Sequence, residues 1–150
     1  MKPDPRLLDP AIYPHSIEVS SRFSDVDPQQ HLNNARLIEF YQEARLSFHQ
    51  RLRSEHGYQR DARSRILVAH LAVDYLGEVD YPGPVVMRMG VTHIGRSSHT
   101  TITALFTAGR CAGLAKAVLV YGIDGSGVPI PDELRALLSR YQLPQALQGL

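Results

Sequence analysis

The amino-acid sequence predicts an α+β fold, a mainly antiparallel sheet of five to six strands that curves around one long helix. Two observations carry this prediction. A single long helical pattern of apolar residues follows the first strand-like segment, and four strand-like segments follow the helix. The joints between those four segments are short, which favours antiparallel neighbours. One sheet around one helix would bury the apolar face of every element within a single domain over residues 1–150.

The segment before the helix is expected to contribute one strand. Residues 1–14 contain four prolines, so we expect an extended lead-in there. From His15 to Phe23 apolar and polar residues alternate, which predicts a half-buried strand with Ile17, Val19 and Phe23 on its inner face. A polar, proline-containing stretch then interrupts regular structure before the helix begins.

The helix is predicted over residues Asn34 to His56. Asn33 and Asn34 are good N-cap residues, and Gly57 is placed to end the helix. Apolar residues recur at spacings of three and four, as on the buried face of a helix. This face is expected to comprise Leu37, Tyr41, Ala44, Phe48 and Leu52, broadened by Ile38 and Phe40.

Four strands are predicted after the helix, followed by a short C-terminal helix over 132–141. The strands are expected at Ile66–Leu76, Val85–Thr92, Ser98–Phe106 and Cys111–Tyr121. In the first of them the inner face is expected to carry Leu67, Ala69, Leu71, Val73 and Tyr75. The last is apolar on both faces, as a central strand would be. The open sheet edge favours pairing with a second copy, so we expect a homodimer or a dimer of dimers.

Composition excludes several classes of function. The formal charge is +1 from 16 basic and 15 acidic residues, so we expect no nucleic acid and no anionic membrane as partner. No apolar run approaches the length of a membrane span, residues 1–11 do not resemble a signal peptide, and a cytoplasmic location is expected. Cys111 stands alone and the histidines are scattered, so we expect no disulfide and no metal site.

Polar residues that could take part in catalysis lie just before the helix. Asp25, Asp27, His31, Asn33 and Asn34 fall within ten residues. A helix N-terminus offers unpaired N–H groups that would polarise a carbonyl oxygen, and a nearby carboxylate would attack the carbonyl or activate water. A thiolate, with a pKa of about 8.5 for the free thiol, leaves without strong acid catalysis, so this pattern suits a thioester. On spacing alone, turn formation and capping explain the same residue types better than catalysis does.

This segment resembles the signature of the 4-hydroxybenzoyl-CoA thioesterase family, which has the hotdog fold. The residues that match are Phe23, Asp25, Asp27, His31, Asn33, Asn34, Glu43, Ala44 and Arg45. Three later segments also resemble the family, namely Asp74–Tyr75 followed by Gly83, Gly95–Ser98 and Pro129–Pro131. The resemblance extends over about 16–138 and implies an acyl-CoA thioesterase that hydrolyses its substrate to free acid and CoA without a cofactor.

The resemblance also implies roles for particular residues. Asp27 would be the catalytic nucleophile or general base, while Asp25 would brace the loop. His31 and Asn33 would shape the site or position water, and the thioester oxygen would lie at the helix N-terminus near Asn34. The turn formed by Gly95, Arg96, Ser97 and Ser98 would lie along the pantetheine and nucleotide arm of CoA, often across a subunit boundary.

The chain departs from the family pattern in ways that keep alternatives open. Gln30 replaces a frequent glycine and Leu37 a frequent tyrosine. The string from Asp27 to His31 is similar to the D-x-N-x-H pattern of plant acyl-ACP thioesterases, with Gln29 at the Asn position. The alternatives are therefore an acyl-ACP thioesterase or a non-catalytic protein of the same fold that binds acyl thioesters.

Two groups of arginines are open to more than one interpretation. Arg36, beside the helix start, would either bind an acidic acyl group or be solvated. A cluster near the end of the helix would either bind CoA phosphates or form an internally paired surface; it comprises Arg51, Arg53, Arg60, Arg63 and Arg65. The identity of the acyl group does not follow from the sequence. Candidate pocket residues, each also a candidate core residue, are Leu37, Tyr41, Leu71, Val73 and Tyr75.

Overall fold

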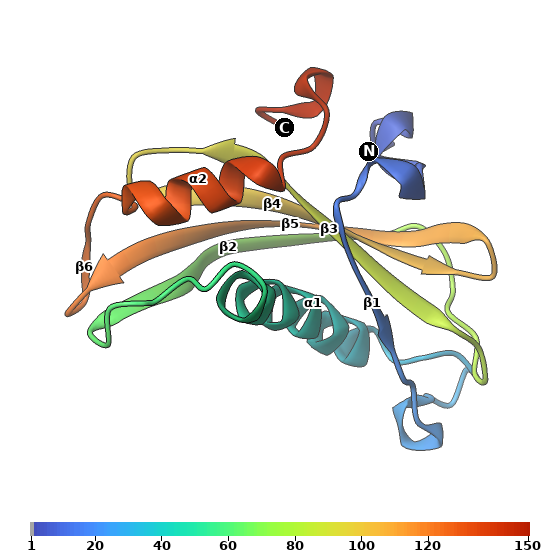
Figure 1. The fold of residues 1–150 in the computed structure, drawn as a ribbon. Helices are drawn as coiled ribbons and strands as arrows, with labels where there is room; N and C mark the ends of the chain where they lie inside the picture. Colours follow the sequence, from blue (N-terminus) through green and yellow to red (C-terminus); the bar gives the residue numbers. More distant parts are fainter. Residues whose placement is uncertain (1) are drawn as a thin grey trace.

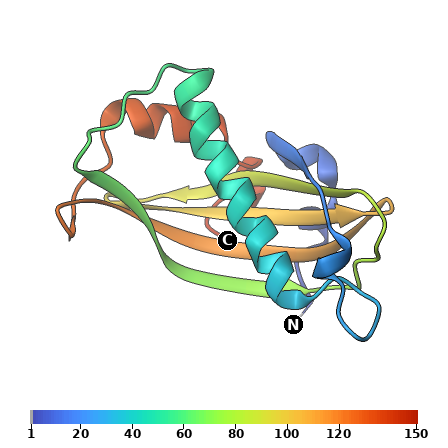
Figure 2. The same ribbon diagram turned by 90° about the horizontal axis from the view of Figure 1, so that it is seen from below.

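A computed structural model describes residues 2–150 and shows one curved antiparallel sheet packed around a long helix, α1 (Asn34–Ser54) (Figure 1). The strands are β1 (His15–Val19), β2 (Ser64–Tyr75), β3 (Val85–Ile94), β4 (Ser98–Thr107), β5 (Arg110–Ile123) and β6 (Ser126–Gly127). Their order is β1-β3-β4-β5-β2, and β6 pairs with β5. Seen from below, α1 crosses the concave face of the sheet (Figure 2). This arrangement is the hotdog fold, as predicted.

The helix α1 begins at the predicted residue, Asn34, and ends two residues before the predicted His56. The Asn33 side chain accepts a hydrogen bond from the Ala35 backbone N–H at 2.8 Å, which caps the first turn. The helix ends after Ser54, and Gly57 adopts a left-handed φ of 67°. The five residues predicted to form its buried face are buried, and so is Phe40. Ile38 is 39% exposed, so the inner face is narrower than expected.

Strand β1 is shorter than predicted. It ends at Val19 because this residue pairs with Val85, the first residue of β3, and no further partner follows. Phe23 therefore leaves the sheet, begins a 3-10 turn and is 78% exposed. The expected extended lead-in is also wrong in detail. Two 3-10 turns, Pro5–Leu8 and Pro10–Ile12, each begin with proline, whose fixed φ suits the first position of a helical turn.

Strand β2 contains a bulge that changes which residues face the core. Pairing with β5 shifts between Val68 and His70, so Ala69 is an extra residue. Leu71 and Val73 pack against the core as predicted. Leu67 does not, and is 62% exposed. The predicted alternation was wrong before the bulge because one inserted residue inverts the face of every residue on one side of it.

The second helix, α2 (Asp132–Arg140), matches the predicted C-terminal helix. It closes the end of the fold at which α1 terminates, and Leu134, Leu137 and Leu138 pack in one core cluster with Leu52. The Tyr141 hydroxyl lies 2.7 Å from His56 Nε2 at the end of α1. The elements therefore leave the two ends of α1 in different surroundings, the loop 20–33 at one end and α2 at the other (Figure 1).

In the part of the chain that the structure describes, no helix is both long enough and apolar enough to span a membrane.

Candidate active site

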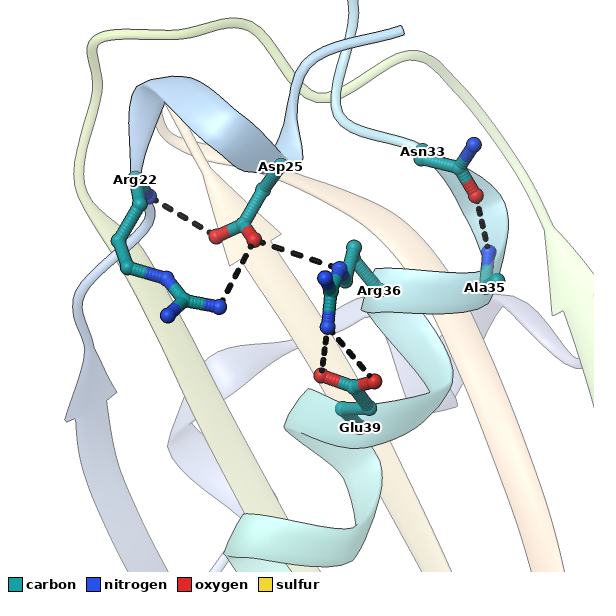
Figure 3. A network of polar contacts seen from close by, with 6 residues as sticks. All are labelled: Arg22, Asp25, Asn33, Ala35, Arg36 and Glu39. Carbon is teal, nitrogen blue, oxygen red and sulfur yellow. Dashed lines mark hydrogen bonds and ion pairs between the residues drawn. The ribbon is translucent and has the colours of Figure 1, made fainter.

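Asp25 holds together the loop that precedes α1. Its buried carboxylate accepts hydrogen bonds from the Arg22 backbone at 2.9 Å and the Arg22 guanidinium at 3.2 Å, and lies 3.5 Å from Arg36 Nε (Figure 3). Its backbone oxygen accepts from the Asn33 N–H at 2.8 Å. Burial alone would raise the pKa of Asp25, but the hydrogen bonds from Arg22 and the two nearby guanidinium charges hold it below its usual value. These contacts agree with the predicted bracing role.

Asp27 is held differently and keeps one carboxylate oxygen free. Its Oδ1 accepts a hydrogen bond from the Gln29 N–H at 2.9 Å. Its backbone N–H donates to the His31 oxygen, and its backbone oxygen accepts from the Gln30 N–H, each at 2.9 Å. No residue between 2 and 150 donates a hydrogen bond to Oδ2 of Asp27. A tight turn thus fixes a half-buried carboxylate and leaves one oxygen available to a ligand.

His31 lies between two carboxylates that the sequence did not single out. Its Nδ1 is 3.2 Å from Asp80 Oδ1, and its Nε2 is 3.2 Å from Glu78 Oε2. Both acidic residues follow β2, and the Leu32 backbone N–H binds the Val79 oxygen at 2.9 Å in the same place. Their sequence distance from His31 explains why no local motif revealed them. The imidazole is therefore linked to the segment after β2 by the hydrogen bond between Nδ1 and Asp80, with the Glu78 carboxylate close to Nε2.

Asn33 and Asn34 occupy the N-terminus of α1 in unequal ways. The Asn33 oxygen is engaged in the helix cap, which leaves only its NH₂ group for a ligand. The backbone N–H of Asn34 has no acceptor among the described residues. The N–H groups that follow it are satisfied by the Asn33 cap and by the first hydrogen bonds of the helix. Tyr75 donates its hydroxyl to the Asn34 oxygen at 3.3 Å. One free N–H thus points out of the helix N-terminus, where the helix dipole adds positive charge.

Three of the four predicted catalytic residues line one pocket of about 300 Å³. Asp27, His31 and Asn34 contribute to its wall, together with Leu37 and Tyr75, two of the residues suggested for the acyl pocket. Asn33 lies outside this lining. The pocket lining thus brings together Asp27, the first residue of α1 and several apolar side chains. Such a site is chemically able to polarise a carbonyl and attack it.

The turn Gly95–Ser98 does not meet this pocket within one chain. It joins β3 to β4 at the other end of α1, where the adjacent Ile94 packs in the same cluster as Leu52 (Figure 1). Arg135 holds the turn by donating to the Gly95 oxygen at 2.8 Å. A helix of 21 residues is about 30 Å long, so the two predicted parts of the site lie far apart in a single chain.

Some of the arginines with more than one interpretation form ion pairs in the structure, and others do not. Arg36 contacts Glu39 at 2.9 Å as well as Asp25, so it does not face the pocket as a free charge. Arg51 pairs with Glu55, and Arg63 pairs with Asp124. Arg65 donates to two backbone oxygens, whereas Arg53 and Arg60 make no ion pair with any of the residues described. The predicted self-paired surface is therefore only partly present.

Comparison with known proteins shows which family the chain belongs to. A sequence profile of the thioesterase-like superfamily matches residues 21–138. The chain belongs to the thioesterase-like superfamily. The match is to this broad group and does not single out the 4-hydroxybenzoyl-CoA thioesterases within it. A search of curated proteins finds no match.

Solved structures of similar proteins agree with this membership. The PA5185 protein from Pseudomonas aeruginosa PAO1 is 28% identical, with a TM-score of 0.77 over 91% of this chain and 96% of its own. A thioesterase from Thermus thermophilus, solved with coenzyme A and zinc, is 29% identical, with a TM-score of 0.73 over 84% and 98%. Within residues 2–150 of this thioesterase-like protein, no group of three or more His, Cys, Asp or Glu side chains is placed to hold a metal ion.

Proposed function

We propose that this protein is an acyl-CoA thioesterase whose reacting carboxylate is Asp27. The observation that carries the proposal is the pocket at the start of α1. Asp27, which keeps one carboxylate oxygen free, and Asn34, whose backbone N–H is free, both line it. Membership in the thioesterase-like superfamily and the similar Thermus thioesterase, solved with coenzyme A, support this proposal.

Two routes fit a carboxylate in this position. In one, an Asp27 oxygen bonds to the carbonyl carbon and the C–S bond breaks, giving a mixed anhydride that water then hydrolyses. In the other, Asp27 takes a proton from water while the resulting hydroxide attacks the carbonyl carbon. Both release CoA as a thiolate, whose conjugate thiol has a pKa of about 8.5, so neither needs a strong acid. The N–H of Asn34 would stabilise the negative oxygen that develops.

His31 is assigned a positioning role in this mechanism. Its backbone oxygen accepts the Asp27 N–H at 2.9 Å, and its ring is fixed between Glu78 and Asp80. These contacts tie the Asp27 turn to the segment after β2. The ring would therefore keep the carboxylate oriented toward the pocket, and changing it should lower turnover more than it weakens substrate binding.

The proposal includes a homodimer that joins along β2. This strand has 12 residues, is an edge of the sheet and carries exposed apolar side chains, Leu67, Val68 and Tyr75 among them. Free strand edges of this kind favour pairing with another strand. An antiparallel pair related by a twofold axis would place the start of β2 in one subunit beside its end in the other. The turn Gly95–Ser98 of one subunit would then approach the Asp27 pocket of its partner.

The test is thiol release from matched acyl-CoA and acyl-ACP substrates by the wild type, Asp27→Asn and Asp124→Asn. Asp124 is a control because it is an exposed carboxylate paired with Arg63, remote from the pocket. Loss of acyl-CoA hydrolysis in Asp27→Asn alone is expected. Equal hydrolysis by wild type and Asp27→Asn would contradict the catalytic assignment. Turnover of acyl-ACP only would identify the carrier protein as substrate holder, and tight binding without turnover would identify a binding protein.

A further inference from the structure

A second hollow lies at the end of α1 that is remote from Asp27. It has a volume of about 160 Å³, and its walls include Leu52, Ile66 and Leu134. Leu52 and Leu134 are buried whereas Arg53 and Arg60 are exposed, so the leucines form the floor and the arginines lie at the mouth. A cavity of about 150 Å³ with apolar walls is known to hold a benzene-sized molecule. The size therefore suits a ring or a branched chain of about six carbons.

The mouth of this hollow carries positive charge that the protein does not neutralise. Neither Arg53 nor Arg60 has a carboxylate within ion-pair distance anywhere in residues 2–150. Two of their neighbours in the arginine cluster, Arg51 and Arg63, are paired with Glu55 and Asp124. Arg65 also lacks a carboxylate but donates to two backbone oxygens, whereas Arg53 and Arg60 line the hollow. Guanidinium groups in this arrangement are suited to bind a carboxylate.

One imidazole lines the hollow and a second packs against it. His49 is in the lining, and its buried Nε2 atom has no hydrogen-bond partner among residues 2–150. His99, from β4, lies outside the lining, is 1% exposed and has no partner on either ring nitrogen among the same residues. The two rings lie 6.3 Å apart in an edge-on arrangement. Buried polar atoms are normally hydrogen-bonded, so the unpartnered Nε2 of His49, a residue that lines the hollow, favours a ligand with a polar group there.

These histidines are uncharged near neutral pH. Burial lowers the pKa of His49 to about 4, with the charges of Arg53, Arg45 and Arg60 acting in the same direction. Burial lowers the pKa of His99 to about 3, and His49 adds to this effect. A neutral imidazole offers one N–H donor and one acceptor, whereas the arginines supply the fixed positive charge. The hollow thus has an apolar floor, a neutral polar side and a cationic mouth.

We propose that this hollow binds a small organic carboxylate with a compact apolar body, at a site distinct from the Asp27 pocket of the same chain. The apolar body would fill the space over Leu52 and Leu134, while the carboxylate would meet Arg53 and Arg60. An inorganic anion would leave the apolar walls uncovered, and a long acyl chain exceeds the volume. Within one chain, Leu52 follows Asn34 by 18 positions, about 27 Å along the helix, so the hollow is not a continuation of that chain's own Asp27 pocket.

The direct test is titration calorimetry with benzoate, cyclohexanecarboxylate, benzyl alcohol and inorganic phosphate. We expect one saturable site per chain for the two carboxylates and at least tenfold weaker binding in Arg53→Gln/Arg60→Gln. Arg63→Gln is the matched control, because Arg63 belongs to the same cluster but lies outside the hollow. Leu46→Trp, at an exposed lining position, should also abolish binding by filling the space without unfolding the core.

Several outcomes would overturn the proposal. Absence of saturable carboxylate binding at millimolar concentration would do so, as would equal affinity for benzyl alcohol, since the charge would then be unused. Displacement of benzoate by equimolar phosphate would indicate a site for any anion. Asp27→Asn should bind benzoate as the wild type does. Because that variant separates binding here from hydrolysis at Asp27, failure of this proposal is distinguishable from failure of the proposed thioesterase function.

Discussion

At the N-terminal end of α1 the charged side chains are paired or hydrogen-bonded, whereas at its C-terminal end several remain without partners. Asp25 and His31 each contact two charged groups of the surrounding segments. Among residues 2–150, Arg53 and Arg60 have no ionic partner, and the buried Nε2 atom of His49 has no hydrogen bond. The first arrangement holds a loop in one geometry. The second leaves polar groups unsatisfied at positions where an incoming ligand would satisfy them.

Polar groups without partners therefore serve different purposes at the two ends of α1. At the N-terminal end only one carboxylate oxygen and one backbone N–H are free, and the rest of the loop orients them. At the C-terminal end Arg53, Arg60 and His49 line a hollow of about 160 Å³. We therefore expect some substitutions at the N-terminal end to lower kcat without lowering the free energy of unfolding. Substitutions at the C-terminal end should lower ligand affinity without changing either quantity.

The largest effect is expected from the two aspartates of the N-terminal end. Asp27→Asn keeps the oxygen that accepts the Gln29 N–H, so its free energy of unfolding should change by less than about 0.5 kcal/mol. Its kcat should fall by at least about 100-fold, because the reacting carboxylate is lost. Asp25→Asn should instead lower the free energy of unfolding by about 1–3 kcal/mol, since a buried carboxylate loses its charged hydrogen bonds.

Urea unfolding and thiol-release kinetics on the same two preparations check this contrast. Both variants are isosteric, so each serves as the control for the other. A large loss of stability in Asp27→Asn would show that this carboxylate, like Asp25, is chiefly structural. Undiminished stability in Asp25→Asn would show that the loop does not depend on its contacts with Arg22 and Arg36.

The C-terminal end should make the protein sensitive to mild acid. Burial lowers the pKa of His15 and His49 to about 4 and that of His99 to about 3. Unfolded histidine takes up a proton near pH 6.5, so between about pH 6.5 and 4 the unfolded state binds more protons than the folded state. The free energy of unfolding should therefore fall as pH falls, by about 1.4 kcal/mol per pH unit for each histidine.

The N-terminal end should act in a lower pH range. The lowered pKa of Asp25 adds stability above its unfolded pKa of about 3.9, and this contribution is lost only as pH falls through the lowered folded value. Urea midpoints from pH 7.5 to 4.5 therefore isolate the histidines. His99→Leu should flatten the slope by about 1.4 kcal/mol per unit, and the exposed His93→Gln should leave it unchanged. An unaltered slope in His99→Leu would mean that this ring is protonated or solvated in the fold.

A third experiment tests whether Arg96 of one subunit contributes to the Asp27 pocket of the other subunit in a dimer. Arg96→Gln should lower kcat/KM about tenfold by removing a phosphate contact, and Asp27→Asn should remove turnover. Random exchange of the two impaired variants would then restore about a quarter of wild-type activity, because half of the dimers are mixed and each mixed dimer has one intact site. If native mass spectrometry shows mixed dimers but activity stays at the sum of the parents, each site belongs to a single chain.

Much of the N-terminal end could be predicted from the sequence because it is local. Asp25, Asp27, His31, Asn33 and Asn34 lie within ten residues, so one helix start and one turn place them together. The helix itself followed from its apolar spacing, which reports burial directly. What the motif did not separate was capping from chemistry, and the structure shows Asn33 in the cap and Asn34 at the pocket.

The remaining features depend on contacts between distant segments. Glu78 and Asp80 reach His31 only because the segment after β2 returns to the loop before α1. Likewise, the hollow near Arg53 combines α1, the chain that follows it, β2 and α2. The face of Leu67 was wrong because a bulge at Ala69 breaks the period of two, and no residue type marks such an insertion. The periodicity of a sequence predicts its helices and strands. Contacts between side chains of different elements can be identified only once the fold is known.

The smallest expected effect lies at Gln30, where the chain departs from the family pattern. Gln30 has a left-handed φ of 69° within the tight turn that holds Asp27, and this region costs a non-glycine residue about 1–2 kcal/mol. Glycine removes that strain but gains freedom in the unfolded chain, about 0.5–1 kcal/mol. Gln30→Gly should therefore raise the free energy of unfolding by about 0.5–1 kcal/mol in urea titration. Gln29→Gly, one position earlier in the same turn, should lower it, and a loss of stability in Gln30→Gly would mean that the Gln30 side chain holds the turn.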